Sequence, residues 1–345
     1  MSELPIWQYD SLLLILVLLF GITALAMQNL MGAAIVFGAY SFLMCLIWTT
    51  MGAVDVAFTE AAVGAGVSTV FIVSTIYNTG VSAIPKSPRI AFKILASLIA
   101  IGTGAFLLSA LPDFPHWGDP KSPVNSIVAP YYIENSMKDA HVPNIVTTVL
   151  ADYRSFDTLL ETTVVFIASI AIYSILRIDN AKLKVIEPDI ITSPPAYDPT
   201  DSLIIRQASR IMVPFMQLFA LYVISHGHYS PGGGFQGGVI LAASIILLCI
   251  SFDLKYVLQY WTEKKIMLLT ALGVLIFALV GLACTLMGGE YLNYGMLDSV
   301  LPGDKAYARS HGILLVEIGV GMTVMFSMIG IYINLASNGR FDRGL

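Results

Sequence analysis

Residues 211–252 read IMVPFMQLFALYVISHGHYSPGGGFQGGVILAASIILLCISF, a tract without any Asp, Glu, Lys or Arg. A helix crosses a bilayer in about 20 apolar residues, so this tract is long enough for two crossings. Residues 225–238 interrupt it with six glycines, one proline and two histidines. Because Gly and Pro disfavour a continuous helix, the interruption predicts a turn between two membrane helices.

The rest of the chain has the same apolar character. Of its 345 residues, 57% are hydrophobic and 12% are charged, and the charged share is about half that of a soluble domain. The blocks that lack any charged side chain are 11–54, 61–85, 94–112, 266–289 and 318–339. We therefore predict an all-α polytopic membrane protein with about nine transmembrane helices. The predicted spans are 11–27, 31–51, 56–77, 90–111, 157–177, 204–225, 236–252, 266–287 and 312–335.

The distribution of Lys and Arg predicts the orientation. The first ten residues contain neither, so the first apolar run is interpreted as a retained helix and not as a cleaved signal. With nine spans, one side of the membrane receives five basic residues, namely Lys121, Lys138, Arg154, Lys305 and Arg309. The other side receives the remaining 13 of the 18 and is therefore predicted to be cytoplasmic. The N-terminus is then outside and the C-terminus cytoplasmic.

Two long connections divide the chain. Residues 112–156 form a predicted outer loop whose apolar patches suggest contact with the membrane surface or a partner. Residues 178–203 form a Pro-rich cytoplasmic linker. We therefore predict one domain of five spans at 1–177 and a second domain of four spans at 204–345.

Five acidic residues at or inside the predicted spans are candidates for an ion path. Ionisable groups in membrane helices are costly and mark functional sites by default. Asp55 and Glu60 open the third span, Asp157 and Glu161 share a face of the fifth, and Glu317 lies in the ninth. Each Glu lies about four to six residues inside its predicted span, roughly 6–9 Å below the outer boundary. Three carboxylates at one depth predict an outer cation path.

A purely structural interpretation, with no role in an ion path, remains open for each charged residue. Acidic side chains also stabilise helix N-termini, and this fits Asp55 and Asp157 best. Lys93, one turn into the fourth span, either joins the path or extends its side chain to the cytoplasmic surface.

The glycine-rich interruption also has alternatives. Residues 232–237 match G-x-G-x-x-G, but nucleotide binding is rejected because no strand precedes them. His226 and His228 are only two possible ligands, so no metal site is predicted. The segment is therefore either a tight turn that brings two helices together or a loop with a direct role in ion passage.

The three cysteines do not predict a cluster or a cofactor site. Cys45, Cys249 and Cys284 lie singly in apolar runs and are interpreted as buried side chains. We expect no bound cofactor, no enzymatic activity and no nucleic-acid partner. Any redox reaction would belong to partner subunits.

Four motifs resemble one family. FALYVISHGHYSPGGGFQGGVILAA at 219–243 and RSHGILLVEIGVGMTV at 309–324 resemble the B subunit of Mrp-type multisubunit Na⁺/H⁺ antiporters, the MnhB or MrpB type. VDVAFTEAAVGAGVST at 54–69 and HVPNIVTTVLADYRSFDTLLETTVV at 141–165 resemble the C-terminal region of the large A subunit. The same regions occur as separate MbhD-like and MbhE-like subunits in membrane-bound hydrogenases. The chain thus resembles an A–B fusion.

The resemblance implies a subunit of a complex in a prokaryotic plasma membrane that exchanges Na⁺ for H⁺. It implies a π-bulge near Gly64 and Gly66, because the first spans resemble the NuoJ type. It also implies acidic positions of the family at Glu60, Glu161 and Glu317. The large antiporter-like region of the A subunit is missing, so we expect a separate subunit of that kind as a partner, with membrane lipid around the assembly.

Two functions from different classes follow. The first is a transport subunit that carries Na⁺ or H⁺ on its carboxylates, within a stand-alone Mrp-type antiporter or within a complex-I-related respiratory complex with a hydrogenase-like or other redox module. The second is a structural scaffold that carries no ion. A transporter that works alone is disfavoured, because the acids near one surface do not complete a route across the membrane.

Overall fold

The structure is a computed structural model that describes residues 6–80, 90–116, 118–177 and 202–337. Within these ranges the regular elements are all helical. The long helices are α1 (Ile6–Ala26), α2 (Leu30–Thr50), α5 (Ile90–Ser109), α8 (Ser155–Leu176), α10 (Leu203–His226), α11 (Gly234–Phe252), α13 (Glu263–Leu286) and α14 (Lys305–Ala336). The shorter elements are α3 (Val54–Glu60), η1 (Ala61–Ser68), α4 (Thr69–Thr79), η2 (Leu111–Asp113), η3 (Val124–Val128), α6 (Ala129–Ala140), α7 (Ile145–Thr148), η4 (Val149–Tyr153), α12 (Leu254–Tyr260) and η6 (Tyr294–Ser299).

The described residues contain nine helices that are long and apolar enough to cross a membrane, as predicted, with α3, η1 and α4 forming one continuous span. Seven begin within three residues of the predicted start, and α1 begins five residues before it, at Ile6. The ninth, α14, begins at Lys305 and not at 312. The reason is the Asp304 side chain, whose carboxylate accepts hydrogen bonds of 3.0 Å from the backbone N–H groups of Ala306 and Tyr307 and so caps the helix earlier.

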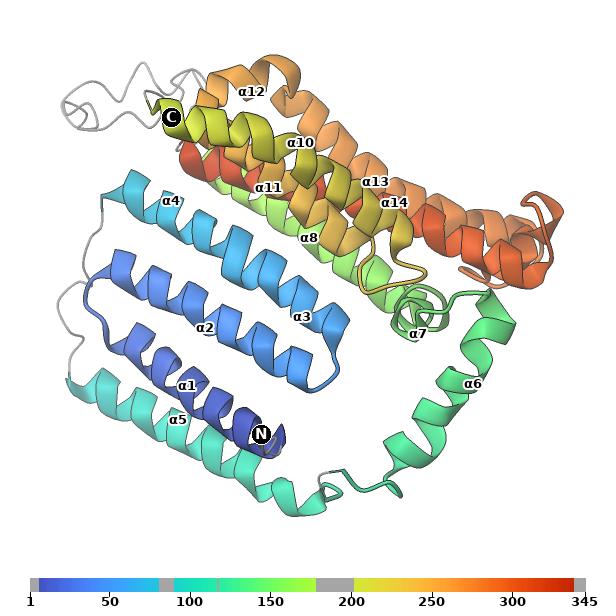
Figure 1. The fold of residues 1–345 in the computed structure, drawn as a ribbon, viewed down its shortest axis with the longest axis horizontal. Helices are drawn as coiled ribbons and strands as arrows, with labels where there is room; N and C mark the ends of the chain where they lie inside the picture. The colour runs from blue at the N-terminus through green and yellow to red at the C-terminus, as the bar shows by residue number, and fades with distance from the viewer. Residues whose placement is uncertain (1–5, 81–89, 117, 178–201, 338–345) are drawn as a thin grey trace, which may run out of the picture.

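The buried centre of the molecule lies around α14. This helix packs against α8, α11 and α13 in one bundle with α10 (Figure 1). Small residues allow the close approach of α13 and α14: a Cβ added at Gly319 would lie 2.8 Å from the carbonyl oxygen of Gly273. Membrane helices commonly use glycine in this way, because packing and not hydrophobicity drives their association.

The helices α1 to α5 form a second group beside this bundle (Figure 1). The group meets the bundle through the third span, because α4 packs on α14 and α3 and η1 pack on α11. The Asn78 side chain at the end of α4 donates hydrogen bonds of 2.9 and 3.0 Å to the carbonyls of Leu335 and Ala336 at the end of α14. By contrast, α5 has no buried residue.

The third span contains a π-helix, η1, from Ala61 to Ser68. The π-bulge expected near Gly64 and Gly66 is therefore confirmed. The extra residue in its turn leaves the Thr69 hydroxyl to donate a 3.3 Å hydrogen bond to the carbonyl of Gly64. π-Turns inside α-helices are rare and occur frequently at functional sites.

The segment between α5 and α8 is partly helical. Figure 1 shows α6 running away from the α5 end towards α7, next to the bundle. The Ser136 hydroxyl on α6 bonds the Thr148 hydroxyl at 2.8 Å and the carbonyl of Val142 at 2.9 Å, all in a buried position. This part packs on α14 of the same chain, and contact with the membrane surface or a partner stays a prediction. The predicted linker 178–203 falls almost entirely outside the described residues.

Candidate functional site

Three of the predicted acids line one cavity. Asp55 from α3, Glu161 from α8 and Glu317 from α14 lie around a space of about 200 Å³, which we call the Glu317 cavity. The glycine-rich turn between α10 and α11, residues 232–236, forms another part of its wall. Segments far apart in the sequence therefore lie together at this cavity, with the three acidic side chains next to the glycine-rich turn.

The glycine-rich turn is held in place by hydrogen bonds from two other elements, α3 and α7 with its N-cap residue. The Asp55 carboxylate accepts a 3.0 Å bond from the Gly232 N–H. On α7, the Thr147 hydroxyl donates to the carbonyl of Gly227 at 2.8 Å, and the Asn144 amide donates to the same carbonyl at 3.1 Å. The backbone N–H of Asn144 donates to the carbonyl of His228 at 2.9 Å. The turn is therefore an ordered part of the wall of the Glu317 cavity.

Glycine is required in this turn for two reasons. Gly232 and Gly233 have φ angles of +149° and +137°, which side chains rarely adopt. A Cβ on Gly233 would lie 2.9 Å from Oε1 of Glu317, and one on Gly227 would lie 3.3 Å from Oε2. The glycines therefore create the space that the carboxylate of Glu317 occupies. The segment therefore lies directly against Glu317.

Glu317 is the most deeply buried acid of the group. It is 8% exposed, and its Oε2 atom has no hydrogen-bond partner among the described residues. A buried carboxylate that keeps its charge without a partner is costly by several kcal/mol. The site therefore favours either a proton on Glu317 or a cation beside it, and a change from one to the other is an ion-exchange step.

Glu60 does not join this cavity, and Asp55 takes the place expected for it. The Glu60 carboxylate lies beside η1, where a Cβ on Gly64 would meet both it and the Ser41 hydroxyl of α2. Five residues separate Asp55 from Glu60, which corresponds to about 140° around a helix, so the two point to different sides. The structure thus places Glu60 outside the Glu317 cavity, and a path shared by Glu60, Glu161 and Glu317 stays a prediction.

The two glutamates of this cavity lie at different distances from the starts of their helices, and their depth in the membrane stays a prediction. Glu161 is six residues from the start of α8, but Glu317 is twelve residues from the start of α14 at Lys305. The two side chains nevertheless line the same cavity. Their proximity results from the packing of α8 on α14 and not from an equal distance along each helix.

The other charged candidates lie outside the cavity wall. Asp157 forms a 2.5 Å ion pair with Arg154 in the first turn of α8, which agrees with the helix-capping alternative. Lys93 is exposed on α5. Neither has a described contact that connects it to Glu317.

The two histidines have separate structural roles. The His226 ring stacks near Tyr222 and Tyr229, with centroid distances of 4.7 and 5.5 Å. The buried His228 ring places Nε2 at 3.0 Å from the carbonyl of Ser310. Burial lowers the pKa of His228 below its usual range, so the neutral ring is the stable form. No group of three metal-ligating side chains occurs in the described part of the chain.

One buried ion pair was not expected from the sequence. Arg309 at the start of α14 donates two hydrogen bonds, of 2.9 and 3.0 Å, to the carboxylate of Asp152 in η4. It also donates to Asn293 at 3.1 Å. Both ends of the pair lie within motifs that the family resemblance rests on, but only the fold shows that they meet.

The comparisons with known proteins agree with this arrangement. Family models match residues 204–330 as a domain related to the MnhB subunit of a Na⁺/H⁺ antiporter. Residues 15–81 match the D subunit and residues 97–188 match the E subunit of the group abbreviated MBH.

Two relatives and one solved structure extend the comparison. The B subunit of a Na⁺/H⁺ antiporter of Bacillus subtilis is 32% identical over 36% of this chain and 92% of its own length. The A/B subunit of a probable K⁺/H⁺ antiporter of Rhizobium meliloti is 24% identical over 89% of this chain. A chain of the Mrp complex from Dietzia sp. matches 96% of this chain with a TM-score of 0.68 and 27% identity.

The chain spans 32% of the Rhizobium protein and 35% of the Dietzia chain. It covers nearly all of the Bacillus protein, and its own first half matches the two MBH subunits. The chain therefore belongs to the Mrp-type antiporter family, as a multi-pass membrane protein in which a region like the C-terminal part of the A subunit is fused to a B subunit.

Proposed function

We propose that the chain forms part of the path for Na⁺ and H⁺ in a multisubunit antiporter, with Glu317 as the exchanging carboxylate. The observation that carries the proposal is the burial of Glu317 against a glycine turn, with Oε2 unpartnered at a cavity that Asp55 and Glu161 share. Carboxylate oxygens are hard ligands that suit a small cation and also accept protons. One group can therefore hold either ion in turn.

Within this proposal the three acids have different roles. Glu161 is exposed on the described chain and would receive a hydrated cation at the cavity mouth. Glu317 would bind the cation after losing its proton, and the proton would leave through the same cavity or towards the opposite side. Asp55 would hold the Gly232 N–H and so keep the turn around Glu317. Glu60 would act elsewhere in the third span, next to η1.

We also propose the setting of this activity. The N-terminus lies outside and the C-terminus in the cytoplasm of a prokaryotic cell, and the parts 1–177 and 204–345 are the two subunit-like units joined by 178–203. The partners are the other Mrp-type subunits, including a separate large antiporter-like subunit. A redox module joins them if the assembly is respiratory.

The identity of the cation needs a separate test, because the Bacillus relative is named as a Na⁺/H⁺ antiporter subunit and the Rhizobium relative as a probable K⁺/H⁺ antiporter subunit. We favour Na⁺, because a cavity walled by carboxylates suits the smaller, harder ion. Exchange measured with each salt in turn would separate the two.

A scaffold that carries no ion is the second candidate. Its support is the set of contacts that tie the two halves together, such as Asp152 with Arg309 and Asn78 with the end of α14. A scaffold predicts that substitutions of the cavity acids change assembly but not ion exchange in the complexes that do assemble.

The deciding experiment uses Glu317→Gln in the full complex in inside-out vesicles, with Glu290→Gln as the matched control at an exposed carboxylate. Sodium-driven proton movement is followed with a pH-sensitive dye, and the amount of each subunit is measured in the same vesicles. We expect exchange to fall at least tenfold in the first variant and to stay normal in the second. Normal exchange by assembled Glu317→Gln complexes would refute the ion-path role.

A further inference from the structure

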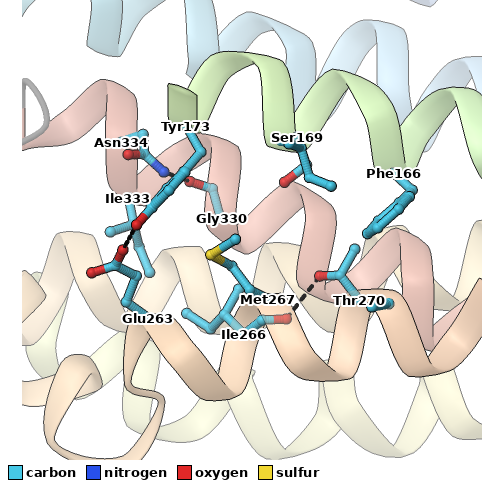
Figure 2. Close-up of a pocket in the computed structure, with 12 residues that line it drawn as sticks. Phe166, Ser169, Tyr173, Glu263, Ile266, Met267, Thr270, Gly330, Ile333 and Asn334 are labelled. Carbon is cyan, nitrogen blue, oxygen red and sulfur yellow. Dashed lines mark hydrogen bonds between the residues drawn. The ribbon is translucent and has the colours of Figure 1, made fainter. Parts of the chain in front are cut away.

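A second cavity lies further along the same pair of helices as the Glu317 cavity. It has a volume of about 130 Å³ and lies between α8, α13 and α14 (Figure 2). On α8, Thr162 lines the first cavity and Ser169 the second. On α14, Val320 lines the first and Asn334 the second. We call the second space the inner cavity.

The helix faces between the two cavities carry buried polar side chains. Along α14, Val320, Thr323, Ser327 and Asn334 recur at steps of three, four and seven residues, so they lie on one side of the helix. Thr323 is fully buried and donates to the carbonyl of Thr270, which lines the inner cavity, at 3.4 Å. A stripe of small residues alone would be ordinary helix packing.

Unpartnered oxygen atoms distinguish this face from ordinary packing. Five buried side-chain oxygens in the described part of the chain have no hydrogen-bond partner, and three of them are on α14: Oε2 of Glu317, Oγ of Ser327 and Oδ1 of Asn334. Asn334 is 4% exposed and lines the inner cavity. Buried polar groups without a partner are costly, and two of these three residues, Glu317 and Asn334, line a cavity in which water or a cation would supply one.

The far end of the inner cavity is polar and lies next to basic residues. Glu263 at the start of α13 accepts a hydrogen bond from the Tyr173 hydroxyl and forms an ion pair with Arg177. Figure 2 shows Glu263 and Tyr173 at one end of the cavity and Phe166 at the other. Arg177, Lys264 and Lys265 mark this end as the cytoplasmic one in the proposed orientation.

Phe166 occupies the position between the two cavities. It follows Thr162 by four residues and precedes Ser169 by three, so the three share one face of α8. Its ring lines the inner cavity, at the end opposite Glu263 (Figure 2). Apolar constrictions of this kind close ion pathways by excluding water.

We propose that the inner cavity is the water-filled inner half of the path that begins at Glu317, and that Phe166 is the gate between the halves. The inference rests on the proposed ion-path function. It supplies the route towards the cytoplasm that the acids near the outer surface lack. A volume of about 130 Å³ has room for several waters, or for a small hydrated cation with Asn334 and Thr270 as oxygen ligands.

Water access is tested first, in assembled complexes whose Cys45, Cys249 and Cys284 are replaced by serine. Ser169→Cys places a thiol in the inner cavity, and Ala168→Cys places one at the same depth on the exposed face of α8. Thiols react as thiolates, which form in water and not in lipid. A small charged thiosulfonate added from the cytoplasmic side should label Ser169→Cys at least tenfold faster. Equal or slower labelling overturns the proposal.

Ion flow is tested next in the same vesicles. Asn334→Leu should lower exchange at least tenfold, Asn334→Gln should restore part of it, and Ala168→Leu on the exposed face of α8 is the control. Phe166→Ala should produce a leak that persists without a sodium gradient, and Phe166→Leu should not. Radioactive sodium and a pH-sensitive dye show separately whether the leaking species is Na⁺ or H⁺. Normal exchange by Asn334→Leu together with no leak in Phe166→Ala refutes the inner path.

The result for Glu317→Gln separates this inference from the proposed function. If that variant loses exchange while Ser169→Cys is unlabelled and Asn334→Leu is normal, the ion-path role stands and the inner cavity fails. If Glu317→Gln exchanges normally while Ser169→Cys is labelled and Asn334→Leu is inactive, the role of Glu317 fails and the inner route stands.

Discussion

Replacing Gly234 by alanine tests whether the glycine turn must touch α14. An added Cβ would lie 2.9 Å from the carbonyl carbon of Glu317 and 3.1 Å from its Cα. Carbon atoms pack at about 3.5–4.0 Å, so the turn and α14 would have to separate by at least about 0.6 Å. Both contacts are to backbone atoms, which cannot rotate away as a side chain could.

Overpacking of this kind costs about 1–3 kcal/mol. At about 1.4 kcal/mol for each factor of ten, the native arrangement around Glu317 would lose roughly 5- to 150-fold in population. We expect sodium-driven proton exchange in vesicles to fall by at least fivefold in Gly234→Ala. Hydrogen exchange of residues 225–238 should become faster at the same time.

Gly102→Ala is the matched control, since an added Cβ on this helical glycine of α5 would have nothing within 4 Å. Alanine favours a helix over glycine by about 1 kcal/mol, so this variant should be at least as stable as the unmodified complex. Exchange and hydrogen-exchange rates in Gly234→Ala that match those of Gly102→Ala would contradict the reasoning.

Three further predictions concern the wall of the Glu317 cavity and two contacts outside it. Asp55→Ala removes a charge-assisted hydrogen bond of about 1.5–3 kcal/mol to Gly232 and should speed hydrogen exchange of the turn roughly tenfold or more, whereas Asp55→Asn should have a smaller effect. Burial lowers the pKa of His228, so the folded turn keeps this ring neutral. Protection of the turn against hydrogen exchange should therefore be full above about pH 6.5 and decrease as the pH falls below that value. His228→Gln should remove this pH dependence, and a pH profile that this substitution leaves unchanged would contradict the prediction. Arg309→Met leaves the buried Asp152 without its partner at a cost of about 3–5 kcal/mol. Proteolysis of residues 112–156 should therefore accelerate. Protection from proteolysis equal to that of the unmodified complex would argue against a stabilising role for the ion pair.

The sequence predicts the helices well because membrane spans depend on local composition. The nine crossings follow from apolar blocks of about 20 residues, and their ends agree with the structure to within a few residues except at α14. There the first turns are polar enough to resemble a loop, and only the cap at Asp304 shows that the helix has already begun. The π-helix of the third span was predicted from resemblance and not from periodicity.

The candidate site was predicted less completely. The acids were identified because charges are rare in membrane helices, but which of them meet depends on how helices rotate about their axes. In the sequence Asp55 is the weaker candidate because it also fits a helix cap, and only the packing of α3 directs it towards the glycine turn. Ser327 and Asn334 are uncharged, so no rule based on charge selects them before their neighbours on α8 and α13 are known.

The contacts between the two halves bear on how such a protein could arise. Asp55 with Gly232, Asn144 with Gly227, Asp152 with Arg309 and Asn78 with the last turn of α14 all join residues before 178 to residues after 201. These four contacts are non-covalent and depend on folded surfaces, so a continuous backbone is not what specifies them. Two shorter polypeptides with the same surfaces would find the same arrangement in the membrane. Joining or separating the two genes would then change the ratio and timing of synthesis of the halves while leaving the proposed ion path unaltered.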